Sequence, residues 1–351
     1  MKRRALLRAA ALAASGLTVG VMPAVGKGEV TKMNEERWDK VFKEDSTVAH
    51  RKVRFVNRYG IELVGDLYTP KAQRGQKLAA LAVSGPFGAV KEQASGLYAQ
   101  TLAAAGFVTL AFDPSFTGES GGSPRNMASP DINTEDFSAA IDYLVTCPEV
   151  DAERIGIVGI CGWGGMALSA AAIDARIKAT VASTMYDMTR VMANGYNDAA
   201  DTAEARDVMR SAMAAARTEH AKTGKPYPGS PGLPEKLTGQ EPLFIKEYWD
   251  YYKTPRGFHA RSINSNGRWA VVMPWSFINF KLLDYAAEIR TPVLLLHGEI
   301  AHSRYFSETA FSKLKGDNKE LLIVPGANHT DLYDRKIPFD AIEAFLKKSL
   351  D

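Results

Sequence analysis

Residues 154–167 read RIGIVGICGWGGMA, an apolar run followed by a glycine-rich turn. The run Ile155–Ile160 does not alternate with polar residues, which is typical of a strand covered on both faces. Helical spacing resumes after the turn, so the stretch predicts a strand, a sharp turn and a helix. Such a turn can hold a nucleophile, here Cys161, at the N-terminus of the helix. Gly159 lets the strand and helix approach closely, whereas Trp163 stands where a small residue is expected.

Short apolar runs recur along the chain from about residue 78 onward, and each predicts a buried strand. The runs are Leu78–Val83, Phe107–Phe112, Ile155–Ile160, Thr180–Ser183, Val293–Leu296 and Leu321–Val324. Helical patterns lie between them and at the end of the chain, over Gln93–Ala105, Thr134–Val145, Gly165–Ala175 and Phe339–Leu350. Repeated strand–helix units predict an α/β fold with a mostly parallel central sheet flanked by helices. Upstream, Lys52–Asn57 and Ile61–Tyr68 predict an antiparallel hairpin at the sheet edge.

One region breaks the alternation of strands and helices. After Asp187 come a helical pattern over Ala199–Thr218, a loop rich in Pro and Gly over Gly224–Pro234, and an aromatic tract. We expect residues 188–287 to form a helical cap over the C-terminal edge of the sheet, where open α/β sheets bind ligands. Most of the aromatic side chains should pack the cap against the core, and two or three should line a pocket.

Five motifs of this chain resemble the α/β-hydrolase superfamily. They are GPFGAVKEQ at 85–93, FDPSFTGES at 112–120, the turn at 159–165, HGE at 297–299 and GANHTDLYD at 326–334. Together they are similar to a bacterial subgroup that looks like dienelactone-hydrolase-type enzymes and the relatives of fungal polyketide transferases. The resemblance covers most of residues 50–350. It implies an α/β-hydrolase fold with a helical cap insertion.

The turn at Cys161 departs from the pattern of this subgroup. Many relatives read Gly-Ile-Cys-x-Ser-Gly-Gly here, but Trp163 occupies the Ser position and cannot attack a carbonyl. Cys161 is then the candidate nucleophile, and a thiol at a helix N-terminus is expected to have a lowered pKa. Alternatively, Cys161 is a small buried apolar residue beside a pocket that Trp163 fills. Cys147 lies too far along the strand to form a disulfide, so both thiols are expected to be free.

The resemblance implies that His329, in a short loop after the last core strand, is the catalytic base. The usual position of the acid that orients this histidine is Ala301 here. Two carboxylates are therefore candidates for that role: Asp187, at the end of the preceding strand, and Glu299, beside the usual position. Either carboxylate could instead cap the helix that follows it.

The loop after the run Leu78–Val83 is expected to supply hydrogen-bond donors to an oxyanion. A backbone N–H of Phe87 or Gly88 would act together with the amide of Gly162, since the preceding proline has no N–H. Lys91 follows at the start of the next helix, where it either pairs with an internal partner or faces the pocket.

The N-terminus carries a separate pattern. Residues 1–26 hold four basic side chains and no acidic one, and an apolar stretch follows the paired arginines Arg3-Arg4. This resembles a twin-arginine export signal cleaved after Gly26. The stretch is shorter than the roughly 20 residues that span a membrane. We therefore expect a periplasmic or secreted protein made of one domain, residues 27–351, with no membrane span after removal of the signal.

Charge and motif content restrict the partners. The whole chain has a net charge of +3, but residues 27–351 carry −1, which does not favour binding to nucleic acid. The histidines outside the motif at 326–334 show no metal-ligand spacing, and the glycine-rich turn lacks the Lys-Ser/Thr of a phosphate loop. We expect a small-molecule substrate, no cofactor and no metal. A homodimer is left open.

The leading hypothesis is an exported enzyme that hydrolyses an ester, lactone or thioester of a small apolar substrate. Cys161 would attack the acyl carbon, and His329 would act first as a base and then as an acid. Because Trp163 and Ala301 replace the usual residues, a second hypothesis is a lyase or isomerase that uses His329 without hydrolysis. A third is a catalytically inactive periplasmic binding protein.

Overall fold

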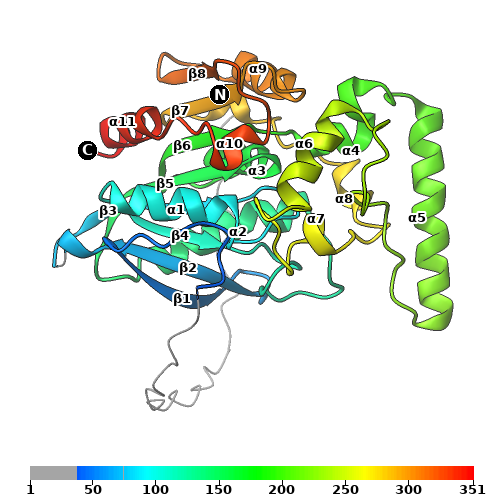
Figure 1. Cartoon of the computed structure of the whole chain (residues 1–351), viewed down its shortest axis with the longest axis horizontal. Coiled ribbons are helices and arrows are strands. Elements are labelled where there is room, and N and C mark those ends of the chain that lie inside the picture. The colour runs from blue at the N-terminus through cyan, green and yellow to red at the C-terminus, as the bar shows by residue number, and fades with distance from the viewer. Residues whose placement is uncertain (1–37, 74) are drawn as a thin grey trace, which may run out of the picture. The chain divides into compact units, whose positions relative to one another are not determined.

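A sheet of eight strands, in the order β1-β2-β4-β3-β5-β6-β7-β8, forms the centre of the computed structural model, which describes residues 38–73 and 75–351 (Figure 1). The strands are β1 Val48–Val56, β2 Glu62–Pro70, β3 Leu78–Ser84, β4 Val108–Phe112, β5 Val150–Ile160, β6 Ile177–Ser183, β7 Val293–Gly298 and β8 Lys319–Val324. β2 pairs antiparallel with β1 and β4, and all other neighbours in the sheet are parallel. The predicted edge hairpin and mostly parallel sheet are confirmed.

Helices cover both faces of the sheet. The flanking helices are α1 Ala94–Ala104, α2 Pro130–Leu144, α3 Gly162–Ile173, α9 Arg304–Lys313, α10 Asp331–Asp334 and α11 Phe339–Leu350. Their contacts place α1, α10 and α11 on one face and α2, α3 and α9 on the other (Figure 1). The strands β3, β5, β6 and β7 are buried along most of their length, which explains why their sequences are continuous apolar runs.

Two boundaries differ from the sequence-based prediction. β5 begins at Val150 rather than Ile155, because its first residues continue the strand across a register shift against β3 and are partly exposed. α3 begins at Gly162 rather than Gly165, directly after Cys161. The glycines in its first turn are poor helix formers, so the sequence pattern does not indicate a helix there. Close packing nevertheless requires glycine at position 164, because a Cβ on Gly164 would lie 2.4 Å from Cβ of Met185.

The strand order brings three loops together at one edge of the sheet. β3 lies between β4 and β5, so the chain continues to β4 on one side of β3 and then returns to β5 on its other side. At such a reversal of strand order, the loops at the C-terminal ends of the parallel strands leave a crevice. Ser84 at the end of β3 pairs with Gly159, and Ile160 at the end of β5 pairs with Ser183 of β6. The loops that follow these strands therefore meet around Cys161.

The segment between β6 and β7 is built mainly of helices, which Figure 1 shows gathered beside the sheet. They are α4 Met188–Asn194, α5 Ala203–Thr223, α6 Leu243–Tyr252, α7 Ile263–Asn266 and α8 Pro274–Phe277. Three short 3₁₀ helices complete the described chain: η1 Lys71–Gln73, η2 Tyr196–Asp198 and η3 Ala286–Glu288. We call residues 188–287 the cap segment. The long helix α5 ends at Gly224, which adopts a left-handed conformation, and buries only Met213.

Contacts group Asp39–Asp351 into one compact unit. The predicted export signal at residues 1–26 lies outside the described residues. Within the described ranges, no helix is both long enough and apolar enough to cross a bilayer.

Candidate active site

Cys161 occupies a strained backbone position between β5 and α3. Its φ of 58° and ψ of −125° lie in a region that residues with a Cβ rarely adopt. The amide of Cys161 donates to the Ser183 carbonyl at 2.9 Å, and its carbonyl accepts from the Tyr186 amide at 2.9 Å. A Cβ on Gly159 would lie 2.2 Å from the carbonyl oxygen of Trp163, so only glycine fits two residues before Cys161. This geometry is that of a nucleophile elbow.

Two backbone amides lie near the sulfur of Cys161. The N–H groups of Phe87 and Gly162 both act to lower the pKa of the thiol. These are the donors expected of an oxyanion hole that forms at the acyl carbon attacked by the sulfur. Gly88 has a different role: its carbonyl accepts from the Asn264 amide at 3.2 Å and from the Ser262 hydroxyl at 2.9 Å, which fastens the cap segment to the loop after β3.

The electrostatics of Cys161 differ from the prediction. Burial raises the pKa of the thiol, and the hydrogen bonds of the Tyr333 hydroxyl and of the Phe87 and Gly162 amides offset this only in part. Desolvation thus outweighs the helix N-terminus, and the expectation of a lowered pKa was wrong. A nucleophilic Cys161 needs a group that accepts its proton. Cys147 and Cys161 are both free thiols, as predicted.

His329 contacts Tyr333, which lines the same cavity as Cys161. Its Nε2 is 3.0 Å from the Tyr333 hydroxyl, and its Nδ1 is 2.5 Å from the Ser303 hydroxyl and 2.9 Å from that of Thr184. The ring is fully buried. Burial, and secondly the nearby His302 and His297, hold the pKa of His329 well below its usual value, so that the imidazole is neutral at physiological pH.

Neither predicted carboxylate orients His329. Asp187 is the N-cap of α4, where its carboxylate accepts the amides of Thr189 and Arg190, each at 3.0 Å. Glu299 accepts the amide of Gly326 at 2.8 Å. Both carboxylates therefore accept hydrogen bonds from backbone N–H groups. For Asp187 this is the helix-capping role that was left open, and for Glu299 it is a contact with the loop after β8.

A chain of hydroxyl and imidazole groups takes the place of the acid. The Ser303 hydroxyl contacts Nδ1 of His329 and lies 2.8 Å from Nε2 of His297, whose Nδ1 is 2.7 Å from the Ser307 hydroxyl. All four side chains are fully buried. Sequence reasoning missed Ser303 because serine carries no charge, although its position two residues after Ala301 was a usable signal.

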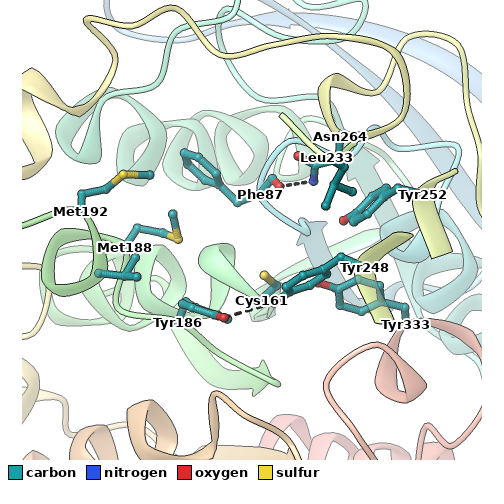
Figure 2. Close-up of a pocket in the computed structure, with 11 residues that line it drawn as sticks. Phe87, Cys161, Tyr186, Met188, Met192, Leu233, Tyr248, Tyr252, Asn264 and Tyr333 are labelled. Carbon is teal, nitrogen blue, oxygen red and sulfur yellow. Dashed lines mark hydrogen bonds between the residues drawn. The ribbon is translucent and has the colours of Figure 1, made fainter. Parts of the chain in front are cut away.

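A cavity of about 290 Å³ opens on Cys161 (Figure 2). Its lining consists of Phe87, Cys161, Tyr186, Met188, Val191, Met192, Leu233, Tyr248, Tyr252, Asn264 and Tyr333. None of these lining residues, among those that the structure describes, carries a formal charge. Two residues of the cap's aromatic tract, Tyr248 and Tyr252, contribute to the lining, in line with the expectation that only a few would.

Trp163 faces the core rather than the cavity. Its ring packs edge-on against Phe112 and Phe137, with centroids 5.8 and 5.4 Å away, and only 1% of the residue is exposed. It touches only a second, much smaller void of about 10 Å³, as does Gly88. The large side chain after the turn is therefore accommodated behind the elbow, and Trp163, a candidate substrate-binding residue because of its place in the turn, does not line the cavity at Cys161.

Lys91 also lies away from the cavity, in a buried cluster of charges. Its Nζ is 2.5 Å from Glu92 and 3.3 Å from Asp113, and it also contacts Glu119. Burial alone would lower the pKa of Lys91, but Asp113 and Glu92 raise it above its usual value. Of the two roles left open for Lys91, the structure shows internal pairing. Arg261 of the cap segment joins the cluster through Glu92, at 2.6 Å.

The sheet order, the elbow and the histidine loop define the class of protein. The alpha/beta hydrolase family model matches residues 83–339. This chain belongs to the alpha/beta hydrolase family, and the predicted α/β-hydrolase fold is confirmed.

This chain is similar in sequence or in structure to the following three proteins. An uncharacterized protein of Pseudomonas aeruginosa is 58% identical over 318 residues, which cover 90% of this chain and 85% of the relative. Its crystal structure has a TM-score of 0.87. A thiohydrolase of Aspergillus aculeatus is 33% identical over 149 residues, 42% of each chain. The crystal structure of the α/β hydrolase GrgF from a Penicillium species shares the fold, with a TM-score of 0.72, 22% identity and coverage of 86% of this chain and 99% of the other.

Proposed function

We propose that this protein hydrolyses an ester, lactone or thioester of a small apolar acyl group, with Cys161 as the nucleophile. The observation that carries the proposal is the position of Cys161, which lines the cavity at the elbow, with the backbone amides of Phe87 and Gly162 near its sulfur. Those amides would stabilise the negative charge that develops on the acyl oxygen. The strained backbone at Cys161 supports a functional role, since such strain is commonly retained where it serves chemistry.

The cavity suggests the kind of acyl group. Methionine and aliphatic side chains line one part of it, and its polar atoms belong mainly to tyrosines. A volume of about 290 Å³ lies at the small end of the range for ligand pockets, which begins near 300 Å³. A short, uncharged acyl chain fits this lining, because the cavity offers no charge to pair with an ionised group.

Leaving-group chemistry favours a thioester. When a thiolate adds to an oxygen ester, the tetrahedral intermediate expels the thiolate more readily than an alkoxide, because the thiol is the stronger acid. With a thioester the two sulfur groups are comparable leaving groups, and collapse can proceed forward. The thiohydrolase name of the Aspergillus relative is in keeping with this preference.

The geometry fits the other two hypotheses, a lyase or isomerase and an inactive binding protein, less well. A lyase or isomerase would need His329 to face substrate, but Tyr333 occupies Nε2 and His329 is not among the residues that line the cavity. A binding protein would have no need for the amides directed at Cys161. The site therefore favours acyl transfer to water.

Alkylation of the thiol tests the proposal. In the Cys147→Ala variant, Cys161 is the sole cysteine, so one carboxamidomethyl group from iodoacetamide marks it alone. We expect labelling to speed up from pH 7 to pH 10, because burial raises the pKa of Cys161. Hydrolysis of p-nitrophenyl butyrate should fall in proportion to the labelled fraction. Full labelling with turnover retained would contradict the proposal.

We also propose that the protein is exported. The supporting observations are Arg3-Arg4, the apolar stretch that follows and the charge contrast between residues 1–26 and the remainder. Mass analysis of the protein from the bacterial periplasm or medium should give a chain that begins at Lys27. Recovery from the cytoplasm alone, with residues 1–26 intact, would contradict export.

A further inference from the structure

Tyr333 contacts the candidate base and shares the cavity with the candidate nucleophile. Tyr333 belongs to α10, is fully buried and lines the cavity beside Cys161 (Figure 2). Its hydroxyl is 3.0 Å from Nε2 of His329, and it lies close enough to the Cys161 sulfur for each group to shift the pKa of the other. Within the described chain, His329 forms no hydrogen bond with Cys161 itself.

The relay requires one of the two proton orders that these contacts allow around His329. In that order Nδ1–H of His329 donates to the Ser303 hydroxyl, which donates in turn to Nε2 of His297, and Nδ1–H of His297 donates to the Ser307 hydroxyl. With its proton on Nδ1, His329 has a lone pair on Nε2. The Tyr333 hydroxyl must then donate to Nε2, and its oxygen is left to accept a proton from the Cys161 thiol.

We propose that Tyr333 is a catalytic residue that relays the proton of Cys161 to His329. The proposal rests on the proposed function, in which Cys161 is the nucleophile. In the activating step the S–H bond of Cys161 breaks and its proton binds the Tyr333 oxygen, while the original hydroxyl proton moves to Nε2 of His329. The products are a thiolate, an unchanged neutral tyrosine and an imidazolium, so charge and atoms balance.

The same relay runs backwards for the leaving group and then repeats for water. After the thiolate adds to a thioester and the carbon–sulfur bond of the leaving group breaks, the Tyr333 proton passes to the departing thiolate and His329 replaces it. In deacylation, a water proton moves by the same route to His329, and the resulting hydroxide adds to the acyl carbon. Cys161 then leaves as a thiolate and recovers the proton.

The surroundings of Tyr333 suit this role. Burial raises the pKa of its hydroxyl well above the usual value, so the group remains a neutral hydroxyl that both donates and accepts. The ring packs edge-on against Tyr251 and Tyr252, with centroids 5.0 and 6.2 Å away. Arg256 of the cap segment holds the helix in place through the carboxylate of Asp334, with contacts of 2.9 and 2.6 Å.

Other tyrosines at the cavity do not have this geometry. The hydroxyl of Tyr186 contacts Nε2 of His302 at 2.6 Å, and that of Tyr248 contacts the same atom at 3.3 Å. Among the described residues that line the cavity, Tyr333 is the one whose hydroxyl forms a hydrogen bond with His329.

The test compares Tyr333→Phe with Tyr251→Phe, assayed on the butyryl thioester of N-acetylcysteamine. Each variant loses one buried tyrosine hydroxyl and keeps the ring, but the Tyr251 ring packs outside the cavity lining. We expect Tyr333→Phe to lower kcat/KM by about 10²- to 10⁴-fold, the usual range for loss of acid–base catalysis. Iodoacetamide labelling of Cys161 at pH 7 should also slow. Tyr251→Phe should change neither rate, because its contribution is structural.

The outcomes separate the relay from the function on which it rests. A Tyr333→Phe protein that is folded and loses less than about tenfold in kcat/KM, while Cys161→Ala is inactive, overturns the relay alone. If Cys161→Ala is active as well, the proposed function fails. Equal losses in Tyr333→Phe and Tyr251→Phe indicate a packing effect and also overturn the relay.

Discussion

Replacing Cys161 by alanine lowers the turnover of p-nitrophenyl butyrate by a factor on the order of 10⁴ to 10⁶, the loss seen when a nucleophile of covalent catalysis is removed. The amides of Phe87 and Gly162 remain in place, so a residual rate above the uncatalysed reaction is expected from the oxyanion site. Alanine keeps a Cβ at the strained position, and the backbone of the elbow should therefore change little.

Two further substitutions complete this experiment. Cys147→Ala removes the other thiol, which does not line the cavity, and should leave turnover unchanged. Cys161→Ser keeps a nucleophilic atom, but its hydroxyl is a weaker acid than the native thiol. This variant should give a rate between those of the alanine variant and the native protein. If Cys161→Ala retains a substantial part of the native turnover, Cys161 is not the nucleophile.

The second large effect concerns stability in acid. Burial lowers the pKa of His297 to about 3 and that of His329 well below 6.5, so both rings are neutral in the folded protein near neutral pH. In the unfolded chain each histidine binds a proton below pH 6.5 or so. The unfolded state then holds more protons, and the free energy of unfolding falls by about 1.4 kcal/mol per pH unit for each histidine.

The sign follows from the lowered pKa values. The stability is fully present above pH 6.5 and is lost progressively as the pH falls toward 3, the folded pKa of His297. Between pH 6.5 and 4.5 His297 alone accounts for about 2.5 kcal/mol, a substantial part of the stability of many domains, and His329 acts in the same direction. Urea unfolding at half-unit steps over this window measures the slope.

A pair of variants assigns the slope to the buried rings. His297→Gln should make the dependence between pH 6.5 and 5 shallower by about 1.4 kcal/mol per pH unit, because one titrating group is gone. His220→Gln, at a partly exposed position on α5, is the control for the substitution itself. Equal slopes in the native protein and His297→Gln would show that this buried histidine is already protonated.

The strands and the position of His329 could be predicted from the sequence because burial leaves a strong pattern. Continuous apolar runs such as Val293–Leu296 occur where both faces of a sheet are covered, and a motif after the last run located His329. The beginning of β5 at Val150 was missed, since its first residues are partly exposed and resemble a loop.

The chemistry around His329 could be predicted only in part. Sequence reasoning looked for a carboxylate, but the groups that contact Nδ1 are the neutral hydroxyls of Ser303 and Thr184. Tyr333 follows His329 by four residues, a spacing that brings side chains together in a helical turn. Desolvation of Cys161 arises from residues distant in sequence, such as Tyr248 and Leu233, which share its cavity, and no local pattern reveals it.

The most direct measurement is the mass of the acyl-enzyme. The native protein is mixed with p-nitrophenyl butyrate and quenched in acid within the first turnover. Peptide mapping should place one butyryl group on the sulfur of Cys161, and the Cys161→Ala protein should carry none. A butyryl group on another residue, or turnover with no acylated cysteine at any time, would contradict nucleophilic catalysis by Cys161.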